Sequence, residues 1–143
     1  MAFTGNFTCN SFKQQLFEGD FDFSSGTTQT FKIALYTNSA TLDQTTTAYT
    51  SSGEVVASGY VAGGNTIVPT LSIDSANGVA YVDFTDASWS SAITARGALI
   101  YKADGVTNPS ICVLDFGSDK ISTNTFQVSF PTNSSTSALI RLG

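Results

Sequence analysis

The sequence contains no histidine and few charged residues, and each absence restricts the chemistry that the chain can perform. Without histidine, a Ser-His-Asp or Cys-His catalytic constellation and a His-ligated zinc site are both excluded. Charged residues make up 12% of the chain, against roughly 25% in an ordinary domain. An enzyme with this composition would have to rely on pairs of carboxylates.

Close pairs of aspartates do occur, but none lies in the ligand-dense loop that a calcium site requires. We interpret them as turn and surface residues: Asp20 with Asp22, Asp83 with Asp86, and Asp115 with Asp119. The run Asp115-Phe116-Gly117 matches a kinase metal motif in letters only, and a strand end followed by a turn explains it better. We therefore expect no enzymatic activity, no cofactor and no metal.

Cysteine, basic residues and long apolar runs are also scarce. Cys9 and Cys112 lie far apart without metal-ligand spacing, which predicts two small buried hydrophobic residues. The six cations are scattered and the net charge is −5, which argues against direct binding of nucleic acid. No segment has the roughly 20 apolar residues of a membrane helix, and no secretory signal opens the sequence. We expect synthesis in the cytoplasm.

The polar residues that are present carry mostly hydroxyl groups, since Ser and Thr together number 39. Thr favours strands, and both residue types close turns through hydrogen bonds to the backbone. A surface rich in hydroxyls and poor in charge resists aggregation less well than a charged one. Such a surface suits a protein that is packed in an assembly.

From Thr30 onward the sequence alternates in period two, and turns recur about every dozen residues. The nearly continuous apolar runs Ala98–Tyr101 and Ile111–Leu114 indicate central strands buried on both faces. We predict an all-β single domain, a β-sandwich or distorted β-barrel with a short N-terminal helix. The predicted core consists of Ile33, Leu35, Val82, Phe84, Leu99, Ile100, Val113, Leu114, Phe126, Val128 and Ile140.

Residues 1–26 differ in composition from the β domain of residues 27–143. They include good helix formers before Gly19, a residue that favours helix ends. They also contain the six phenylalanines Phe3, Phe7, Phe12, Phe17, Phe21 and Phe23. Either this segment packs into the chain's own core, or it is an arm whose phenylalanines form an interface with a neighbouring subunit.

Several stretches resemble virion structural proteins of tailed bacteriophages of the cyanophage and marine phage type. The stretches cover most of the chain: Phe3 to Lys13, Thr30 to Leu42, Thr47 to Thr50, Gly53 to Val55, Gly59-Tyr60, Gly63-Gly64, Thr94 to Tyr101 and Val113 to Lys120. The resemblance implies a structural role and no catalytic residues.

Within a virion, a small acidic β domain is most similar to a capsid decoration (cement) protein. Such proteins sit on the capsid exterior and stabilise the head by bridging subunits of the major capsid protein. We also expect a homo-oligomer, with a trimer favoured because three-fold capsid axes offer repeated sites. A tail or neck component is one alternative. A carbohydrate-binding module is the other, with Trp89, Tyr49, Tyr60, Tyr81 and Tyr101 as possible stacking platforms.

Overall fold

A computed structural model describes residues 3–143 and confirms a mostly β protein with one short helix. The largest sheet has five antiparallel strands in the order β1-β8-β7-β2-β3. Their bounds are Phe7–Thr8, Ser110–Ile121, Thr94–Lys102, Phe31–Tyr36 and Asn65–Ile67. The helix α1, Asn10–Glu18, follows β1 and ends at Gly19, whose φ of 84° is left-handed.

Two smaller antiparallel sheets complete the fold. One has the order β10-β5-β4, and the other pairs β6 with β9. The first contains Ile140–Leu142, Val79–Phe84 and Pro69–Asp74, and the second contains Ala87–Trp89 and Phe126–Val128. None of these sheets closes on itself, so the arrangement is consistent with the predicted sandwich and not with a barrel.

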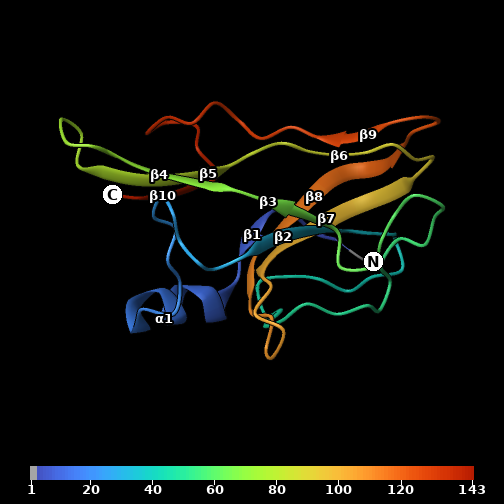
Figure 1. Cartoon of the computed structure of the whole chain (residues 1–143), viewed down its shortest axis with the longest axis horizontal. Helices are drawn as coiled ribbons and strands as arrows, with labels where there is room; N and C mark the ends of the chain where they lie inside the picture. The colour runs from blue at the N-terminus through green and yellow to red at the C-terminus, as the bar shows by residue number, and fades with distance from the viewer. Residues whose placement is uncertain (1–2) are drawn as a thin grey trace.

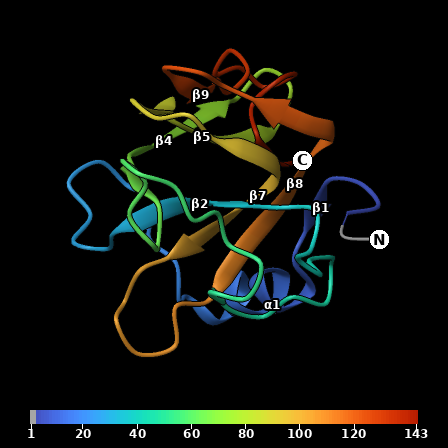
Figure 2. The same ribbon diagram turned by 90° about the vertical axis from the view of Figure 1, so that its right-hand side faces the viewer.

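The three sheets and the helix are arranged in layers (Figures 1 and 2). The small sheets lie on one side of the five-stranded sheet, and part of the loop that follows β2 lies on the other (Figure 2). Helix α1 faces the sheet of β10, β5 and β4 at one end of the molecule (Figure 1). Because elements cover both faces of the large sheet, its central strands are apolar almost continuously. Residues Ala98–Tyr101 and Ile111–Val113 are all buried, as predicted.

Tight connections join consecutive strands into hairpins, whereas two segments of strand-like composition form no strand. The turn at Asn77-Gly78 joins β4 to β5, and the loop before Ser110 joins β7 to β8. The segments Glu54–Val56 and Gly59–Val61, which have strand-like compositions, lie in a long loop instead. Their backbone N–H groups bond to turn and strand carbonyls instead: Val55 N–H donates to the Leu35 carbonyl at 2.9 Å, and Tyr60 N–H donates to the Ala57 carbonyl at 3.1 Å.

The segment Asp115-Phe116-Gly117 does not end a strand, which corrects the interpretation from sequence. It lies inside β8, which continues to Ile121. Gly117 has a φ of 82°, and the β7–β8 register shifts between Ala95 and Gly97, opposite this segment. An irregular ladder with a left-handed glycine is how a long strand bends without ending.

The predicted core is buried with two partial exceptions. Leu114 and Ile140 are half-buried, and the other predicted core residues are buried. The sequence-based list omitted the aromatic and N-terminal members of the core, among them Phe3, Phe12, Phe31 and Trp89.

Replacing Leu99 by Ala should lower the free energy of unfolding by about 2–5 kcal/mol, because a cavity adds to the lost transfer energy. Leu99 is fully buried in central strand β7. Val106→Ala is the matched control, since Val106 is 86% exposed in the β7–β8 loop, and it should change stability by about 0.5 kcal/mol or less. Urea unfolding measures both, and equal values for the two variants would contradict this assignment of the core.

Candidate binding surface

The structure buries four of the six N-terminal phenylalanines in the chain's own core. Phe3 and Phe12 are each 1% exposed, and Phe21 and Phe23 are also buried. Phe12 meets Phe21 edge-on at 4.8 Å between ring centroids, and Phe23 stacks on Phe31 of β2 at 4.9 Å. The interpretation of these four as docking residues is therefore corrected, because their apolar surface is already covered.

Phe3 is fixed by a close approach to strand β7. A Cβ atom at Gly97 would lie 2.4 Å from the Phe3 ring, so the ring occupies space that only a glycine leaves open. The Arg96 guanidinium lies over the same ring at 5.8 Å from its centroid. The first residues of the described chain are thus an integral part of the β domain.

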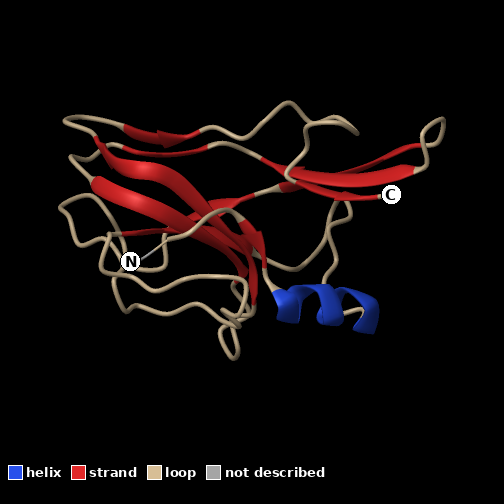
Figure 3. Cartoon of the chain, turned by 180° about the vertical axis from the view of Figure 1, so that it is seen from behind, coloured by secondary structure: helices blue, strands red, loops and turns tan. Residues whose placement is uncertain are grey.

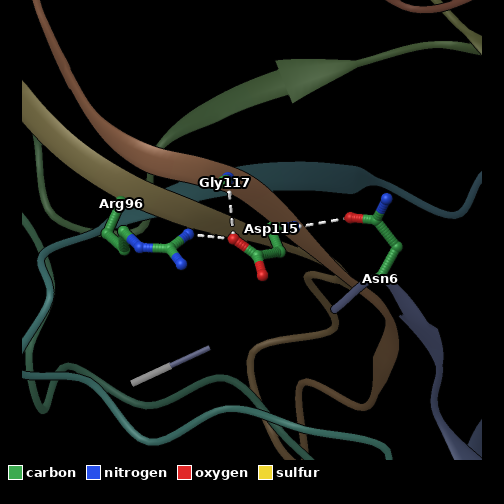
Figure 4. A network of polar contacts seen from close by, with 4 residues as sticks. All are labelled: Asn6, Arg96, Asp115 and Gly117. Carbon is green, nitrogen blue, oxygen red and sulfur yellow. Dashed lines mark hydrogen bonds and ion pairs between the residues drawn. The ribbon is translucent and has the colours of Figure 1, made fainter. Parts of the chain in front are cut away.

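A polar network holds the same segment to strand β8 (Figure 4). The Asp115 N–H donates to Asn6 Oδ1 at 2.6 Å. The Asp115 carboxylate accepts a hydrogen bond from Gly117 N–H at 2.8 Å and forms an ion pair with Arg96. Asp115 therefore has a structural partner on each side, which accounts for it without any metal.

The remaining phenylalanines differ from these four. Phe7 is half-buried in β1, whereas Phe17 is 87% exposed on α1. Phe17 borders a groove of about 720 Å³ between α1 and the C-terminal strand β10. The opposite wall includes Ile140 and Leu142, and Lys13 and Arg141 add positive charge to a chain of net charge −5.

The groove continues along the small sheet as a second hollow of about 240 Å³. The same face of this sheet carries Leu71 and Ile73 of β4, which are 51% and 70% exposed. Helix α1 and the C-terminus lie at this end of the molecule (Figure 3). Exposed apolar side chains around a hollow are typical of a surface that binds another protein. We call the surface bounded by Phe17, Ile140 and Leu142 the apolar groove.

A second notable cluster surrounds Glu54, which is only 7% exposed. Its carboxylate accepts hydrogen bonds from Tyr49 Oη at 2.6 Å, Tyr60 Oη at 2.7 Å and Gly63 N–H at 2.7 Å. Tyr101 Oη donates to the Gly63 carbonyl at 2.7 Å. The cluster fixes the loop between β2 and β3 against the five-stranded sheet, because Tyr60 Oη also accepts the Leu35 N–H at 2.9 Å.

The Glu54 cluster gives a structural reason for several residues of the loop between β2 and β3. Tyr49, Glu54, Tyr60 and Gly63 are separated in the sequence but meet around a single carboxylate. Gly64 belongs to the same turn, where a Cβ would lie 1.8 Å from the Ile33 carbonyl oxygen. Sequence reasoning missed this cluster, although a lone acidic residue amid tyrosines and glycines in a long loop was the available signal.

The other candidate residues have structural surroundings. Asp83 is 3% exposed in β5, so it is not the surface residue predicted from sequence, and burial raises its pKa. Asp86 accepts a hydrogen bond from Phe130 N–H at 2.8 Å. Cys9 and Cys112 are buried free thiols, as predicted. Among residues 3–143, no three acidic or cysteine side chains are grouped closely enough to hold a metal ion.

The aromatic residues considered as carbohydrate platforms are mostly covered. Trp89, Tyr60 and Tyr101 are buried, and Tyr49 stacks on Tyr101 at 4.8 Å between centroids. A ring packed in the core cannot stack on a sugar.

No helix in the described part of the chain is long and apolar enough to cross a membrane. Comparisons with family models, curated proteins and solved structures found no match.

Two phenylalanines on the same helix allow core and surface roles to be separated. Phe12→Ala should cost about 3–5 kcal/mol of stability, because it empties a filled site in the core. Phe17→Ala should change stability by about 0.5 kcal/mol or less, because the side chain is in water. Thermal and urea unfolding measure both variants. A Phe12→Ala protein with the stability of the wild type would show that the N-terminal segment is an independent arm.

The tyrosines around Glu54 predict loss of stability at alkaline pH. Burial, followed by the Glu54 charge, raises the pKa of Tyr101 to about 12, and burial also raises the pKa values of Tyr36, Tyr49 and Tyr60. Because the folded-state values exceed the ordinary value of about 10, stability present at neutral pH falls as the pH rises from about 10 through 12. We expect the absorbance of tyrosinate at 295 nm to rise at a pH above the ordinary value of about 10, together with unfolding. Titration of these tyrosines near pH 10 in a protein that stays folded would contradict this.

Proposed function

We propose that this chain is a structural protein of a tailed-bacteriophage virion, specifically a capsid decoration protein that binds subunits of the major capsid protein on the exterior of the head. The observation that carries the proposal is the apolar groove, together with the resemblance stated above. Exposed Phe17 and Leu142 line a hollow on a chain that is rich in hydroxyl groups.

The groove fits an apolar protein segment better than a small metabolite. Its charged lining residues are Lys13 of α1 and Arg141 of β10, whose guanidinium donates to the Thr136 carbonyl at 2.6 Å, and the rest of its wall is largely aliphatic and aromatic. A protein segment with apolar side chains and a flanking carboxylate would match both features. Such binding requires no enzymatic group, no cofactor, no metal, no nucleic acid and no membrane.

The Glu54 cluster supports the same role indirectly. A capsid-bound protein works by keeping its shape while several weak contacts form together, and buried hydrogen-bonded networks make a structure rigid. Tyr49 and Gly63 both donate hydrogen bonds to the Glu54 carboxylate, and these bonds hold the long loop between β2 and β3 in one conformation. A tail or neck component would need the same properties, so the position in the particle is the discriminating measurement.

The test uses purified particles separated into heads and tails, with the protein quantified in each by mass spectrometry. We expect it in the heads, in many copies. Its presence in tails alone would overturn the decoration role and leave a structural one, and its absence from both would overturn the proposal.

Particles lacking the protein then test the groove. Added wild-type protein should bind the heads, and Phe17→Ser or Leu142→Ser should weaken binding about tenfold or more, the size expected of central contact residues. Val56→Ser is the matched control, because Val56 is 98% exposed but lies in the loop between β2 and β3, outside the lining of the groove. Equal binding by all variants would show that another surface contacts the shell.

A further inference from the structure

Strand β4 is an unusual edge of the fold. Among residues 3–143 it is the longest edge strand, with six residues, whereas the edge strands β1, β3, β6, β9 and β10 have two or three. Natural proteins commonly protect long edges with lysines, inward-pointing charges or bulges, because an open edge can pair with another strand. Within β4, Pro69 and Asp74 occur only at the two ends.

The pairing of β4 with β5 determines which backbone groups remain free. The register places Thr70 opposite Asp83 and Ser72 opposite Tyr81. The Thr85 N–H donates to the Val68 carbonyl at 3.0 Å, so the residue pairs that exchange hydrogen bonds include Val68 with Thr85 and alternate from there. Thr70, Ser72 and Asp74 therefore bond to β5, and the N–H and C=O groups of Leu71 and Ile73 point away from the sheet.

The two residues with outward-pointing backbone groups are also the exposed apolar residues of the strand. Leu71 and Ile73 are 51% and 70% exposed and project from one face of the sheet. A strand that paired with this edge would satisfy two donors and two acceptors and would cover both side chains. This combination identifies the edge as a site for strand addition.

We propose that the strand added to this edge is β4 of a second copy of the chain, in an antiparallel pair about a two-fold axis at Ser72. This register places Leu71 opposite Ile73 of the other copy, so the outward-pointing backbone groups of both strands pair completely. Thr70 lies opposite Asp74, a hydroxyl against a carboxylate, and no like charges meet. Shifting the register by two residues in one direction would place Pro69, which has no N–H, opposite Ile73. The opposite shift would place Leu71 opposite Ser75, beyond the end of β4.

This pairing is isologous and closes on itself, so it stops at two copies. Three-fold assembly would need a second, different surface for each β4 edge, and no other edge strand of residues 3–143 has comparable length. We therefore favour a pair over the trimer expected from sequence. The apolar groove lies beside β10, at the opposite edge of the same small sheet, so a pair would present two grooves at once and gain avidity for a lattice.

A self-disulfide tests the register directly. Ser72→Cys would place two sulfurs across the axis in a non-hydrogen-bonded pair, with Cα atoms about 4.5 Å apart and within the range that a disulfide spans. Mild oxidation of the full chain with oxidised glutathione should give a covalent dimer on a non-reducing gel. Thr70→Cys is the matched control, because its two copies would lie roughly 13 Å apart and should stay monomeric on the gel. Failure of Ser72→Cys to cross-link, or equal cross-linking of both, would overturn the register.

Solution size tests the pair without a cross-link. Sedimentation velocity should show a concentration-dependent dimer for the wild type. Ile73→Pro removes one outward N–H and leaves the bonds to β5 intact, so it should raise the dimer dissociation constant about tenfold or more. Leu71→Lys, a second variant with no effect on backbone conformation, should do the same. A wild-type monomer at all concentrations, or a trimer that survives both changes, would overturn the proposal.

This inference rests on the β4 edge and stands apart from the decoration role. A dimer that is absent from virions would overturn only the proposed function. A monomer that is present on heads would overturn only the pair.

Discussion

The burial of one carboxylate, that of Glu54, determines how the long loop between β2 and β3 is folded. Glu54 is buried, and a buried carboxylate is tolerated only when hydrogen-bond donors replace its hydration. Tyr49, Tyr60 and the Gly63 N–H supply those donors. To bring them together, the chain between β2 and β3 must follow one path, and that path includes Gly64 at a position where a side chain would strike the Ile33 carbonyl. The loop is long and nearly without strands, yet it is well defined.

The N-terminal aromatic residues hold α1 in place at the other end of the sheet. Phe12, Phe21 and Phe23 pack against Phe31 and Phe84, so α1 is bound to β2 and β5 through rings. This packing supports α1 as one wall of the apolar groove. The groove therefore lies between elements whose positions are fixed by the core. Its exposed side chains, such as Phe17, do not pack into that core.

The sequence was sufficient to predict the strands with strong local patterns. Runs such as Ala98–Tyr101 are apolar on both faces wherever the sheet is covered on both sides, and the Asn77-Gly78 turn has a local chemical cause. The burial of the N-terminal segment and of Glu54 was harder to predict, for one reason. Whether Phe3 packs on its own chain depends on Gly97, and whether a glutamate is buried depends on tyrosines brought from elsewhere. Local pattern contains no information about such distant partners.

The connection between Asn6 and Asp115 has a consequence for how the chain comes to be folded. This hydrogen bond joins residues 109 positions apart, and β1 can pair only after its partner β8 has been synthesised. At ribosomal speeds of about 5–20 residues per second, Asn6 waits roughly 5–20 seconds for Asp115 to be synthesised. Folding dominated by such non-local contacts is intrinsically slow. In the newborn chain, Phe3 and β1 therefore remain without their tertiary partners until β7 and β8 have been synthesised.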